Sequence, residues 1–584
     1  MEPILDLSDR QWFKAGLWPE ETPKHMEYPE DFPIWKYLEE SAYTNPDNVA
    51  TIFFDAKITY KELWERVLRF ADSLQKLGIK KGDRIGIYLP NCPQFVISFF
   101  AINRLGATIV PFNTQYVDHE LTYQLNDSGA RTIITIDITY GRVRNLRKRG
   151  KAELDHIIVA SLHDELPTSK RILGILTGKL PLRKRINPED LSFNALIRDG
   201  NPENVPDVPI NPKEDLALIQ YTGGTTGVSK GTMLTHFNVI SNQIQTHALY
   251  YPPARHGMET WVVVLPLFHI YALNVCMIAS IAFAGKMILI TDPLAGRPIL
   301  QDLLETLAKY KPTYFHAVPS LYLGLCFHKD IKDYDLTSIN ACLSGAAPLP
   351  EQVMYNFEEL TGANVVEGYG LTETSPVTHV NPFTPGGKRA GSIGFPIPDT
   401  DARIFDLKDG NKELPIGEGN EGEIGIKGPQ VMKGYWNKPE ETKNTFNDSG
   451  YFLTGDVGYI DEDGYFYITG RKKNMIDVSG LKVYPREVEE LIIEHPAIQE
   501  VAVIGIPHKI KGEEVAAFVV LKDDETASSE EIIEFCKGRI ARFKVPRKVF
   551  FIDELPKSAI GKVLHRELRD EVWKKAGRKR SIAG

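Results

Sequence analysis

The sequence predicts an α/β protein with two doubly wound α/β subdomains, a small antiparallel β unit and a small mobile α+β C-terminal domain. Short apolar segments alternate with longer helical segments over residues 33–116 and again over residues 260–366, a pattern typical of βαβ units. After about residue 382 the chain changes to short runs divided by glycine and proline, which are typical of antiparallel β structure. From about residue 474 a compact alternation of strand and helix segments resumes.

The segments of the first stretch follow one another in a regular order. Long segments with helical periodicity separate short runs rich in β-branched residues, and this order predicts parallel strands joined by helices. The helical and extended segments are residues 34–55, 59–78, 83–91, 94–106 and 108–113. In the second stretch the predicted strands are residues 262–266, 287–290, 314–319 and 341–345. We therefore expect two stacked α/β subdomains.

Length, charge and cysteine content exclude several classes of protein. At about 150 residues per domain, the 584 residues predict about three or four domains. The 68 basic and 77 acidic residues give a net charge of −9, which argues against nucleic-acid binding as the main task. The cysteines have no CxxC spacing and are odd in number, which indicates a reducing compartment without a zinc knuckle. They are Cys92, Cys276, Cys326, Cys342 and Cys536.

Two segments bear on membranes and targeting. The first twelve residues carry acidic side chains where a signal peptide would carry basic ones, so we expect a cytoplasmic protein. Residues 261–285 lack Lys, Arg, Asp and Glu and are long enough to span a bilayer. Pro266, His269 and Asn274 interrupt this stretch, and segments buried in an α/β core are equally apolar, so we expect core structure there.

The first chemical signal is a loop rich in threonine and glycine at residues 221–236, after an apolar strand and before a helical segment. Glycines let backbone N–H groups approach an anion, and Lys230 adds a point charge, so the loop suits phosphate oxygens. Further donors are the hydroxyls of Thr222, Thr225 and Thr226. Because Gly231 follows the lysine, this is not a Walker A loop, and a motor ATPase or GTPase is disfavoured. On composition alone, a flexible surface turn remains the alternative.

This loop resembles the phosphate loop of the adenylate-forming superfamily of acyl- and aryl-CoA synthetases, luciferases and peptide synthetase adenylation domains. Val228-Ser229 stands where that family usually has a proline before the lysine. Six more segments resemble the family's other motifs in the family's order: LPLFH 265–269, SGAAPLP 344–350, EGYGLTET 367–374, TGDVGYIDEDGYFYITGRKK 454–473, SGLKVYPREVE 479–489 and PKSAIGKVLHREL 556–568. The resemblance extends from about residue 34 to residue 568. It is closest to the long- and medium-chain fatty acid CoA ligases, as in the run MKGYWNKPEET at residues 432–442.

The resemblance implies a nucleotide site. The ring of Tyr369 can stack on adenine, and Glu373 offers the hard oxygen that Mg²⁺ prefers, with Thr226 as the second implied metal ligand. Taken alone, Glu373 also fits a solvated side chain in a glycine-rich loop. The implied ATP-binding residues are Thr222, Gly223, Gly224, Thr225, Thr226, Gly227, Lys230, Gly345, Ala346, Ala347, Glu367, Gly368, Tyr369, Gly370, Thr372, Asp456, Arg471 and Lys562.

Two of these residues are implied to bind the ribose. Asp456 can accept hydrogen bonds from both vicinal hydroxyls, and the planar fork of Arg471 completes the contact. Residues 461–464, with the sequence DEDG, are expected to form a plain hairpin turn without chemistry. His269 resembles the family's gate beside the acyl carboxylate, although a histidine on an apolar run also fits a satisfied core residue.

The C-terminal motifs are implied to serve the two half-reactions. Lys562 is the adenylation lysine by resemblance, and Lys473 takes the hinge position at which the small domain rotates. The implied CoA-binding residues are Ser479, Gly480, Leu481 and Lys482. The implied domains are an N-terminal adenylation domain at 1–470, a hinge at 471–473 and a mobile C-terminal domain at 474–584, with the β unit at about 383–470.

The function implied is a two-step ligation with the catalytic residues Lys562, Thr226, Glu373 and His269. ATP activates a medium- or long-chain fatty acid to acyl-AMP with release of pyrophosphate, and CoA then takes the acyl group. The cofactors are ATP, Mg²⁺ and CoA, and no nucleic acid is involved. An aryl acid CoA ligase of the 4-coumarate type, an acyl-AMP ligase serving a carrier protein and a non-enzymatic lipid-binding scaffold are the alternatives. Keeping all five charged motif residues argues against the scaffold: Lys230, Glu373, Asp456, Arg471 and Lys562.

A basic segment at residues 169–185 indicates a possible partner. It combines apolar residues with six cations and no acid, which suits peripheral contact with the inner face of a membrane. The cations are Lys170, Arg171, Lys179, Arg183, Lys184 and Arg185. An ordinary solvated insertion is the alternative, since Gly174, Gly178 and Pro181 weaken a helix. A homodimer is also left open.

Overall fold

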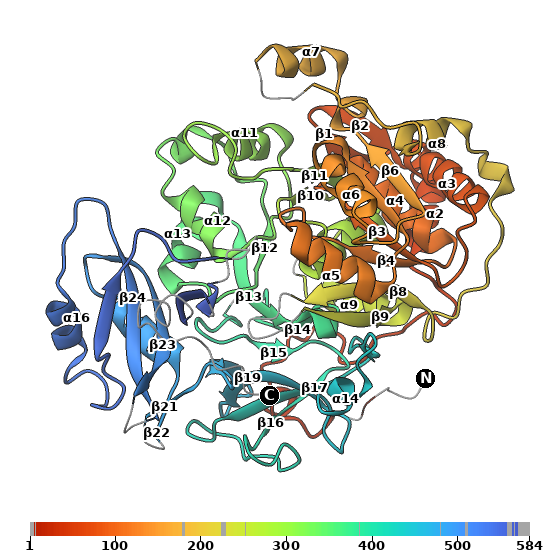
Figure 1. Cartoon of the computed structure of the whole chain (residues 1–584). Helices are drawn as coiled ribbons and strands as arrows, with labels where there is room; N and C mark the ends of the chain where they lie inside the picture. The colour runs from red at the N-terminus through yellow and green to blue at the C-terminus, as the bar shows by residue number, and fades with distance from the viewer. Residues whose placement is uncertain are drawn as a thin grey trace. The chain divides into compact units, whose positions relative to one another are not determined.

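The computed structural model describes residues 5, 7–177, 182–222, 229–250, 253–384, 386–478, 481–508, 512–557, 563–565 and 567–569. By its internal contacts the chain forms two compact units (Figure 1). The first comprises Met1–Gly223, Ser229–Asp401 and Lys427–Asn444. The second comprises Gly224–Val228, Ala402–Ile426 and Thr445–Gly584.

The first unit contains an eight-stranded sheet in the order β18-β9-β8-β4-β3-β5-β6-β7. The strands from β8 to β7 pair in parallel, while β9 and β18 pair antiparallel at one edge. The bounds are β3 Arg84–Tyr88, β4 Thr108–Pro111, β5 Thr132–Ile136, β6 His156–Ala160, β7 Leu191–Ser192, β8 Leu216–Thr222, β9 Lys230–Thr235 and β18 Gly434–Tyr435. The non-sequential order of mostly parallel strands is the doubly wound arrangement that the alternating pattern predicts.

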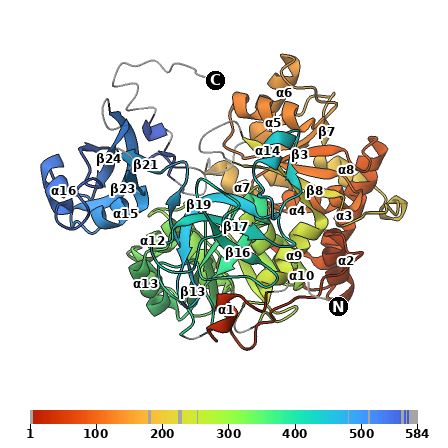
Figure 2. The same cartoon turned by 90° about the horizontal axis from the view of Figure 1, so that it is seen from below.

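Helices connect these strands. The helix α3 begins with a capping box, in which Thr59 and Glu62 bond to each other's backbone N–H groups, and its apolar stripe is buried. The helix α4 is buried from Pro93 to Asn103, so it lies inside the unit. Figure 2 shows α3 and α8 side by side. The bounds are α2 Trp35–Thr44, α3 Tyr60–Lys76, α4 Pro93–Arg104, α5 Asp118–Ser128, α6 Asp137–Lys148, α8 Phe193–Asp199 and α9 His236–His247.

The second sheet of this unit has two parts, β10-β11-β1-β2 and β12-β13-β14-β15. Tyr314 forms parallel bridges to both Trp261 and Ala341, so it connects the two parts. The bounds are β1 Val49–Phe53, β2 Ala56–Thr59, β10 Thr260–Val263, β11 Lys286–Leu289, β12 Ala341–Ser344, β13 Asn364–Gly370, β14 Val377–Val380 and β15 Phe395–Pro396. Helices α11 Gln301–Tyr310, α12 Pro319–Cys326 and α13 Glu351–Thr361 belong to the same half of the unit.

Two strands depart from the sequence prediction. The hairpin of β1 and β2 belongs to the second sheet, although its residues fall within the first alternating stretch. The strand β1 pairs in parallel with β11, as in the register Thr51 to Met287. A pairing between residues so far apart in sequence leaves no trace in local periodicity. The sequence pattern therefore could not show that the two subdomains interleave along the chain.

The apolar stretch at residues 261–285 is core structure, as expected. It contains β10, the π-helix η3 (Tyr271–Ile278) and α10 (Ala279–Ala282), and the residues of η3 are all buried. Asn274 satisfies its amide by donating to the carbonyls of Val239 and Ser375. Among the helices that the structure describes, none combines the length and apolarity needed to cross a bilayer.

The second unit contains two sheets. In the order β16-β17-β19-β20, the pairs β17–β19 and β19–β20 are antiparallel, as predicted for a glycine-rich β unit. The other sheet has the order β22-β21-β24-β23, with β25 parallel to β24, and packs with α15 and α16 around an aliphatic core. The bounds are β16 Asp401–Phe405, β17 Gly422–Lys427, β19 Phe452–Ile460, β20 Phe466–Arg471, β21 Ile476–Val478, β22 Leu481–Val483, β23 Ile498–His508, β24 Gly512–Leu521, β25 Lys548–Phe551, α15 Pro485–Ile492 and α16 Ser529–Cys536. This is the predicted α+β architecture.

Candidate active site

The predicted phosphate loop joins two antiparallel strands. The strand β8 ends at Thr222 and β9 begins at Lys230, and these two residues face each other in register. A helix does follow the predicted loop, because α9 begins at His236, but residues 230–235 of that loop form the strand β9. Gly231 makes this pairing possible, since a Cβ there would lie 2.6 Å from Ile219. The predicted residues Gly223, Gly224, Thr225, Thr226 and Gly227 lie outside the described residues.

Lys230 lies in a cluster that the sequence did not reveal. Its ammonium pairs with Glu441 and lies 4.9 Å from the ring centroid of Tyr435. The hydroxyl of Tyr435 donates to Oε1 of Glu373 at 2.8 Å. One buried tyrosine therefore contacts both the predicted phosphate lysine and the predicted magnesium ligand.

Backbone hydrogen bonds fix this cluster. The strand β18 pairs with β9 through Tyr435 and Thr232, and Trp436 N–H donates to the carbonyl of Gly231 at 2.7 Å. On the other side, Met432 N–H donates to the carbonyl of Glu373 at 2.8 Å. Residues 432–436 thus connect the strand that carries Lys230 to the turn that carries Glu373.

The turn that carries Glu373 is closely packed, and the glutamate itself is half-buried. The short helix η5 (Thr372–Thr374) follows β13, and the buried hydroxyl of Thr374 donates to the carbonyl of Pro376 at 2.6 Å. At Gly370 a Cβ would lie 2.0 Å from that same carbonyl oxygen, so the bend needs glycine. These contacts therefore fix the backbone of the turn from which the Glu373 side chain extends.

The donor set at Glu373 fits Mg²⁺. Tyr435 supplies a hydrogen bond to one carboxylate oxygen, and the side chain is not fully buried, which leaves a hard oxygen for a cation. In the described part of the chain, no three His, Cys, Asp or Glu side chains are grouped so that they could hold a metal ion together. Mg²⁺ commonly binds through one or two carboxylates together with substrate phosphates, so a single glutamate is compatible with it.

The strands β12 and β13 bring two predicted motifs together. They pair in parallel, with Ser344 opposite Glu367, so SGAAPLP and EGYGLTET leave the same edge of the sheet. Ligands bind to α/β sheets at such carboxyl ends. Past β12, Ala346 has a φ of 71°, a conformation that residues with a Cβ seldom adopt and that often marks functional sites. Gly345 lies against the ring of Tyr271, which a Cβ would approach to 3.1 Å.

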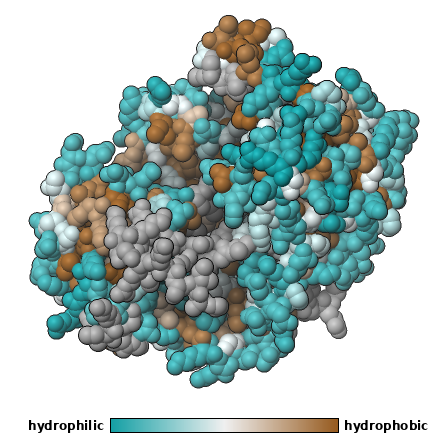
Figure 3. Space-filling view, viewed as in Figure 1, coloured by the Kyte–Doolittle hydropathy of each residue, from teal (hydrophilic) through white to brown (hydrophobic). Residues whose placement is uncertain are grey.

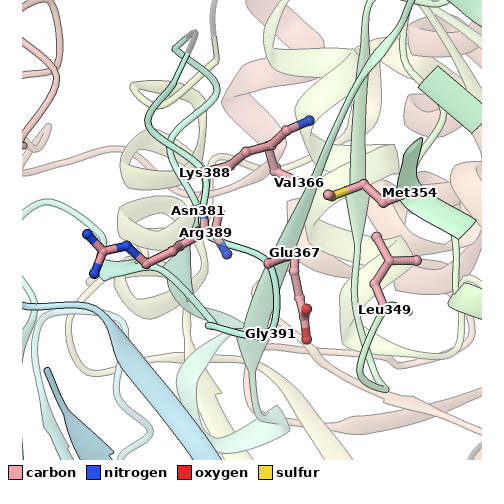
Figure 4. A pocket seen from close by; sticks show the side chains of 9 residues that line it. Leu349, Met354, Val366, Glu367, Asn381, Lys388, Arg389 and Gly391 are labelled. Carbon is pink, nitrogen blue, oxygen red and sulfur yellow. Dashed lines mark hydrogen bonds between the residues drawn. The ribbon is translucent and has the colours of Figure 1, made fainter. Parts of the chain in front are cut away.

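A pocket opens beside the end of β13 (Figure 4). Glu367, only 8% exposed, lies along one wall, and Lys388 lies in the opposite part of the pocket and pairs with Glu358. The lining residues are Leu349, Met354, Val366, Glu367, Asn381, Lys388, Arg389, Ala390 and Gly391. Of the predicted site residues, this pocket includes Glu367 alone; Gly368, Tyr369 and Gly370 continue along β13 beyond it.

The loop that carries His269 is held from two sides. Asn91 donates to the carbonyls of Val263 and Leu265 and accepts from the N–H of Leu267. Gln220, on β8, donates to the carbonyl of Phe268 at 2.8 Å. His269 itself accepts from the N–H of Tyr271 through Nδ1 at 3.3 Å and is half-buried at the start of η3. Asn91 and Gln220 thus position the histidine, a role that the sequence analysis did not assign.

In the second unit, Asp456 and Arg471 lie opposite each other on β19 and β20. Arg471 Nε donates to Oδ1 of Asp456 at 2.7 Å, and the aspartate is almost fully buried. The structure therefore brings together the two residues implied for ribose. The hairpin after β19 turns at residues 461–464, where Asp461 accepts from the N–H groups of Asp463 and Tyr465, as expected of a plain turn.

The remaining predicted residues are at least partly exposed or lie outside the described part of the chain. Lys473 is exposed in the turn between β20 and β21. Leu481 and Lys482 begin β22, and Leu481 is 50% exposed. Ser479, Gly480 and Lys562 lie outside the described residues, so the CoA loop and the adenylation lysine stay predictions. The hinge role of Lys473 stays a prediction as well.

Comparisons with known proteins give the family. The model of the AMP-binding enzyme family matches residues 38–436, and that of the AMP-binding enzyme C-terminal domain matches residues 487–562. A long-chain-fatty-acid–CoA ligase of Bacillus subtilis (strain 168) is 43% identical over 94% of this chain and 98% of its own length. One of Escherichia coli O6:H1 is 39% identical, with 94% of both chains covered.

Solved structures agree with these matches. ATP-bound MatB from Rhodopseudomonas palustris has a TM-score of 0.80 at 30% identity, covering 94% of this chain and all of that one. A Mycobacterium tuberculosis fatty acyl CoA synthetase has a TM-score of 0.71 at 29% identity, covering 93% and 99%. The chain belongs to the AMP-binding enzyme family.

Proposed function

We propose that this protein is a fatty acid CoA ligase that acts on medium- or long-chain acids. It activates the carboxylate with ATP to give acyl-AMP and pyrophosphate, and CoA then takes the acyl group and AMP leaves. Relatives at 43% and 39% identity, aligned over nearly their whole length, are named long-chain-fatty-acid–CoA ligases. The structural observation that carries the proposal is the contact of Tyr435 with both Lys230 and Glu373.

This cluster suits binding of a nucleoside triphosphate. Lys230 brings a positive charge to the end of the glycine-rich loop, where phosphate oxygens would lie. Glu373 would hold Mg²⁺, which when bound neutralises charge on the phosphates. A carboxylate is a poor acyl donor because its oxygen is a poor leaving group. In the adenylate that oxygen is bonded to the α-phosphorus, with pyrophosphate expelled, so it can leave as part of AMP.

The other nucleotide contacts belong to the same proposal. Tyr369 stacks on adenine beside the small residues Gly345 to Ala347, and Glu367 lies at the edge of that region. Asp456 binds the ribose hydroxyls with Arg471. Thr226 joins Glu373 at the metal, and Lys562 assists the expulsion of pyrophosphate.

The domain arrangement is proposed as well. Residues 1–470 form the adenylation domain, and residues 474–584 form a smaller domain that turns about Lys473 between the half-reactions. The family models support this division, because the C-terminal model begins only at residue 487. Residues 479–482 would then serve the CoA step. A homodimer stays a prediction from the sequence.

The proposal is tested by measuring pyrophosphate release over straight-chain acids of graded length, with and without CoA. We expect release to need ATP, Mg²⁺ and a fatty acid, and acyl-CoA to appear only with CoA. Benzoate and 4-coumarate serve as controls for the aryl alternative. Faster turnover of either aryl acid, or transfer only to a carrier protein, would overturn the assignment.

A further inference from the structure

The helix α7 (Thr168–Leu176) stands out in the first unit because none of its residues is buried. It projects from the body of that unit in Figure 1, and Figure 3 shows hydrophobic residues covering it. Ile172, Leu173 and Leu176 are 52%, 60% and 78% exposed. Leu182, shortly after the helix, is 75% exposed. Exposed aliphatic residues gathered on one short element are uncommon on a soluble surface unless something covers them.

These leucines and the isoleucine share one side of the helix. At about 100° per residue, Ile172, Leu176 and Leu173 fall within an arc of about 100°. Lys170 flanks this arc, about 60° beyond the nearest of them. The helix is therefore amphipathic, with one apolar face and a cation beside it.

An ion pair of Lys170 joins this helix to the rest of the first unit. Its ammonium lies 2.5 Å from Oδ2 of Asp55, at the tip of the β1–β2 hairpin. The other oxygen of Asp55 contacts Lys309 at 2.5 Å and the hydroxyl of Tyr310, both on α11. Burial works to raise the pKa of Asp55, but the hydrogen bonds and charges of the two lysines outweigh it and lower that pKa. The anchor holds the Lys170 side of the helix against the body, and the apolar face next to it stays exposed.

The surrounding charge is cationic. Residues 166–188 contain no Asp or Glu. Arg183 is neutralised by Asp164 at 2.9 Å, whereas Arg171 and Arg185 form no ion pair with any described residue. An exposed apolar helix face, in a segment that also carries unpaired arginines, fits the boundary between acyl chains and anionic headgroups. Nine residues are too few to span a bilayer, so the helix would lie in its plane.

We propose that α7 is the element by which this enzyme binds the surface of an anionic phospholipid bilayer. Ile172, Leu173 and Leu176 enter the acyl boundary, and Arg171 and Arg185 lie among the headgroups. The benefit of this binding to the enzyme rests on the proposed function, because long-chain fatty acids partition into bilayers and the enzyme would meet its substrate there. The binding itself needs no catalysis.

The test is flotation of the full-length protein with phosphatidylcholine vesicles, with and without phosphatidylglycerol. We expect binding to the anionic vesicles only, weakened by salt. Leu173→Glu with Leu176→Glu should lower the bound fraction by at least about tenfold, because it places charges at the acyl boundary. Arg171→Gln with Arg185→Gln should remove most of the salt dependence. Phe327→Glu is the matched control, since Phe327 is 77% exposed on a different element, and it should bind like the wild type.

Three outcomes would overturn the proposal. They are a wild type that does not float, a leucine variant that floats as well as the wild type, and a leucine variant whose only change is a smaller oligomer in sedimentation. The last result would mean that a second copy of the chain covers the face. Ligation of octanoate in vesicle-free buffer separates this inference from the proposed function. The leucine variant should keep that activity, and a wild type that floats but does not ligate octanoate or longer acids would contradict only the proposed function.

Discussion

Tyr435→Phe tests whether the tyrosine positions Glu373 for the nucleotide. The substitution removes one hydroxyl, which donates to Oε1 of Glu373 at 2.8 Å, and keeps the ring that lies 4.9 Å from the ammonium of Lys230. A hydrogen bond to a charged group contributes about 1.5–3 kcal/mol. Because Glu373 is not fully buried, we take the lower end, about 1.5 kcal/mol, which corresponds to about a tenfold change. We therefore expect kcat/KM for ATP to fall about tenfold.

The assay is pyrophosphate release at saturating fatty acid, with Mg²⁺ titrated at fixed ATP. Because the lost contact is to the proposed metal ligand, half-saturation by Mg²⁺ should rise in the variant. A second readout is the increase in Tm that Mg-ATP produces, which should shrink. Tyr60→Phe is the matched control, since Tyr60 is fully buried and its hydroxyl donates to the carbonyl of Gly285 far along the chain. An equal Mg²⁺ response in wild type and Tyr435→Phe would refute the positioning role, whatever happens to the Tm.

Two further predictions follow from the same structure, and a third follows from the sequence motif around Lys562. Glu441→Gln frees Lys230 from an ion pair whose side chains are 37% and 42% exposed. Since such exposed pairs contribute up to about 1 kcal/mol, the ATP concentration needed for half-saturation should fall by at most about fivefold. A rise in that concentration would contradict the reasoning. Burial lowers the pKa of His236, His316 and His379 to about 3 and that of His247 to about 4. Below pH 6.5, the ordinary pKa of histidine, these side chains therefore bind protons in the unfolded chain but not in the folded one. The free energy of unfolding should fall by about 1 kcal/mol per histidine as the pH is lowered from 6.5 to 5.5. Urea denaturation at a series of pH values measures this slope, and a flat profile would show that these histidines are protonated in the folded protein. Lys562→Ala should nearly abolish adenylation while thioester formation from preformed acyl-AMP survives, and equal loss of both rates in separate assays would exclude the assigned role.

The sequence predicted those parts of the fold that depend on local periodicity. The helix α3 and the strand β3 match their predicted segments because an apolar stripe or a short β-branched run suffices to specify each one. The place of β1 in the second sheet depends instead on its pairing with β11, which local patterns do not record. The strand β9 was missed for a related reason, since its extended form comes from pairing with β8.

The site shows the same division. Motif order identified Lys230 and Glu373, and the structure brings both into contact with Tyr435. Tyr435 and Glu441 were missed, although the run MKGYWNKPEET was noticed, because their role comes only from the pairing of β18 with β9. In sequence this run lies between β17 and β19 of the second unit, yet Lys427–Asn444 makes its contacts with the first. A linear reading of that region as β structure alone could not assign it chemistry.

Lys230 has an acidic partner, Glu441, and an aromatic partner, Tyr435, and the two should affect ATP binding in opposite directions. Glu441 offers the lysine a negative charge that a triphosphate must replace, so this ion pair competes with the nucleotide and its removal should favour binding. The ring of Tyr435 offers a contact that bound phosphate does not displace, because a cation can interact with a ring face and an anion together. Its hydroxyl also orients Glu373 at the same time. If both arguments hold, Glu441→Gln and Tyr435→Phe shift the ATP dependence with opposite signs, and a change of the same sign in both variants would mean that residues 432–441 act only by packing.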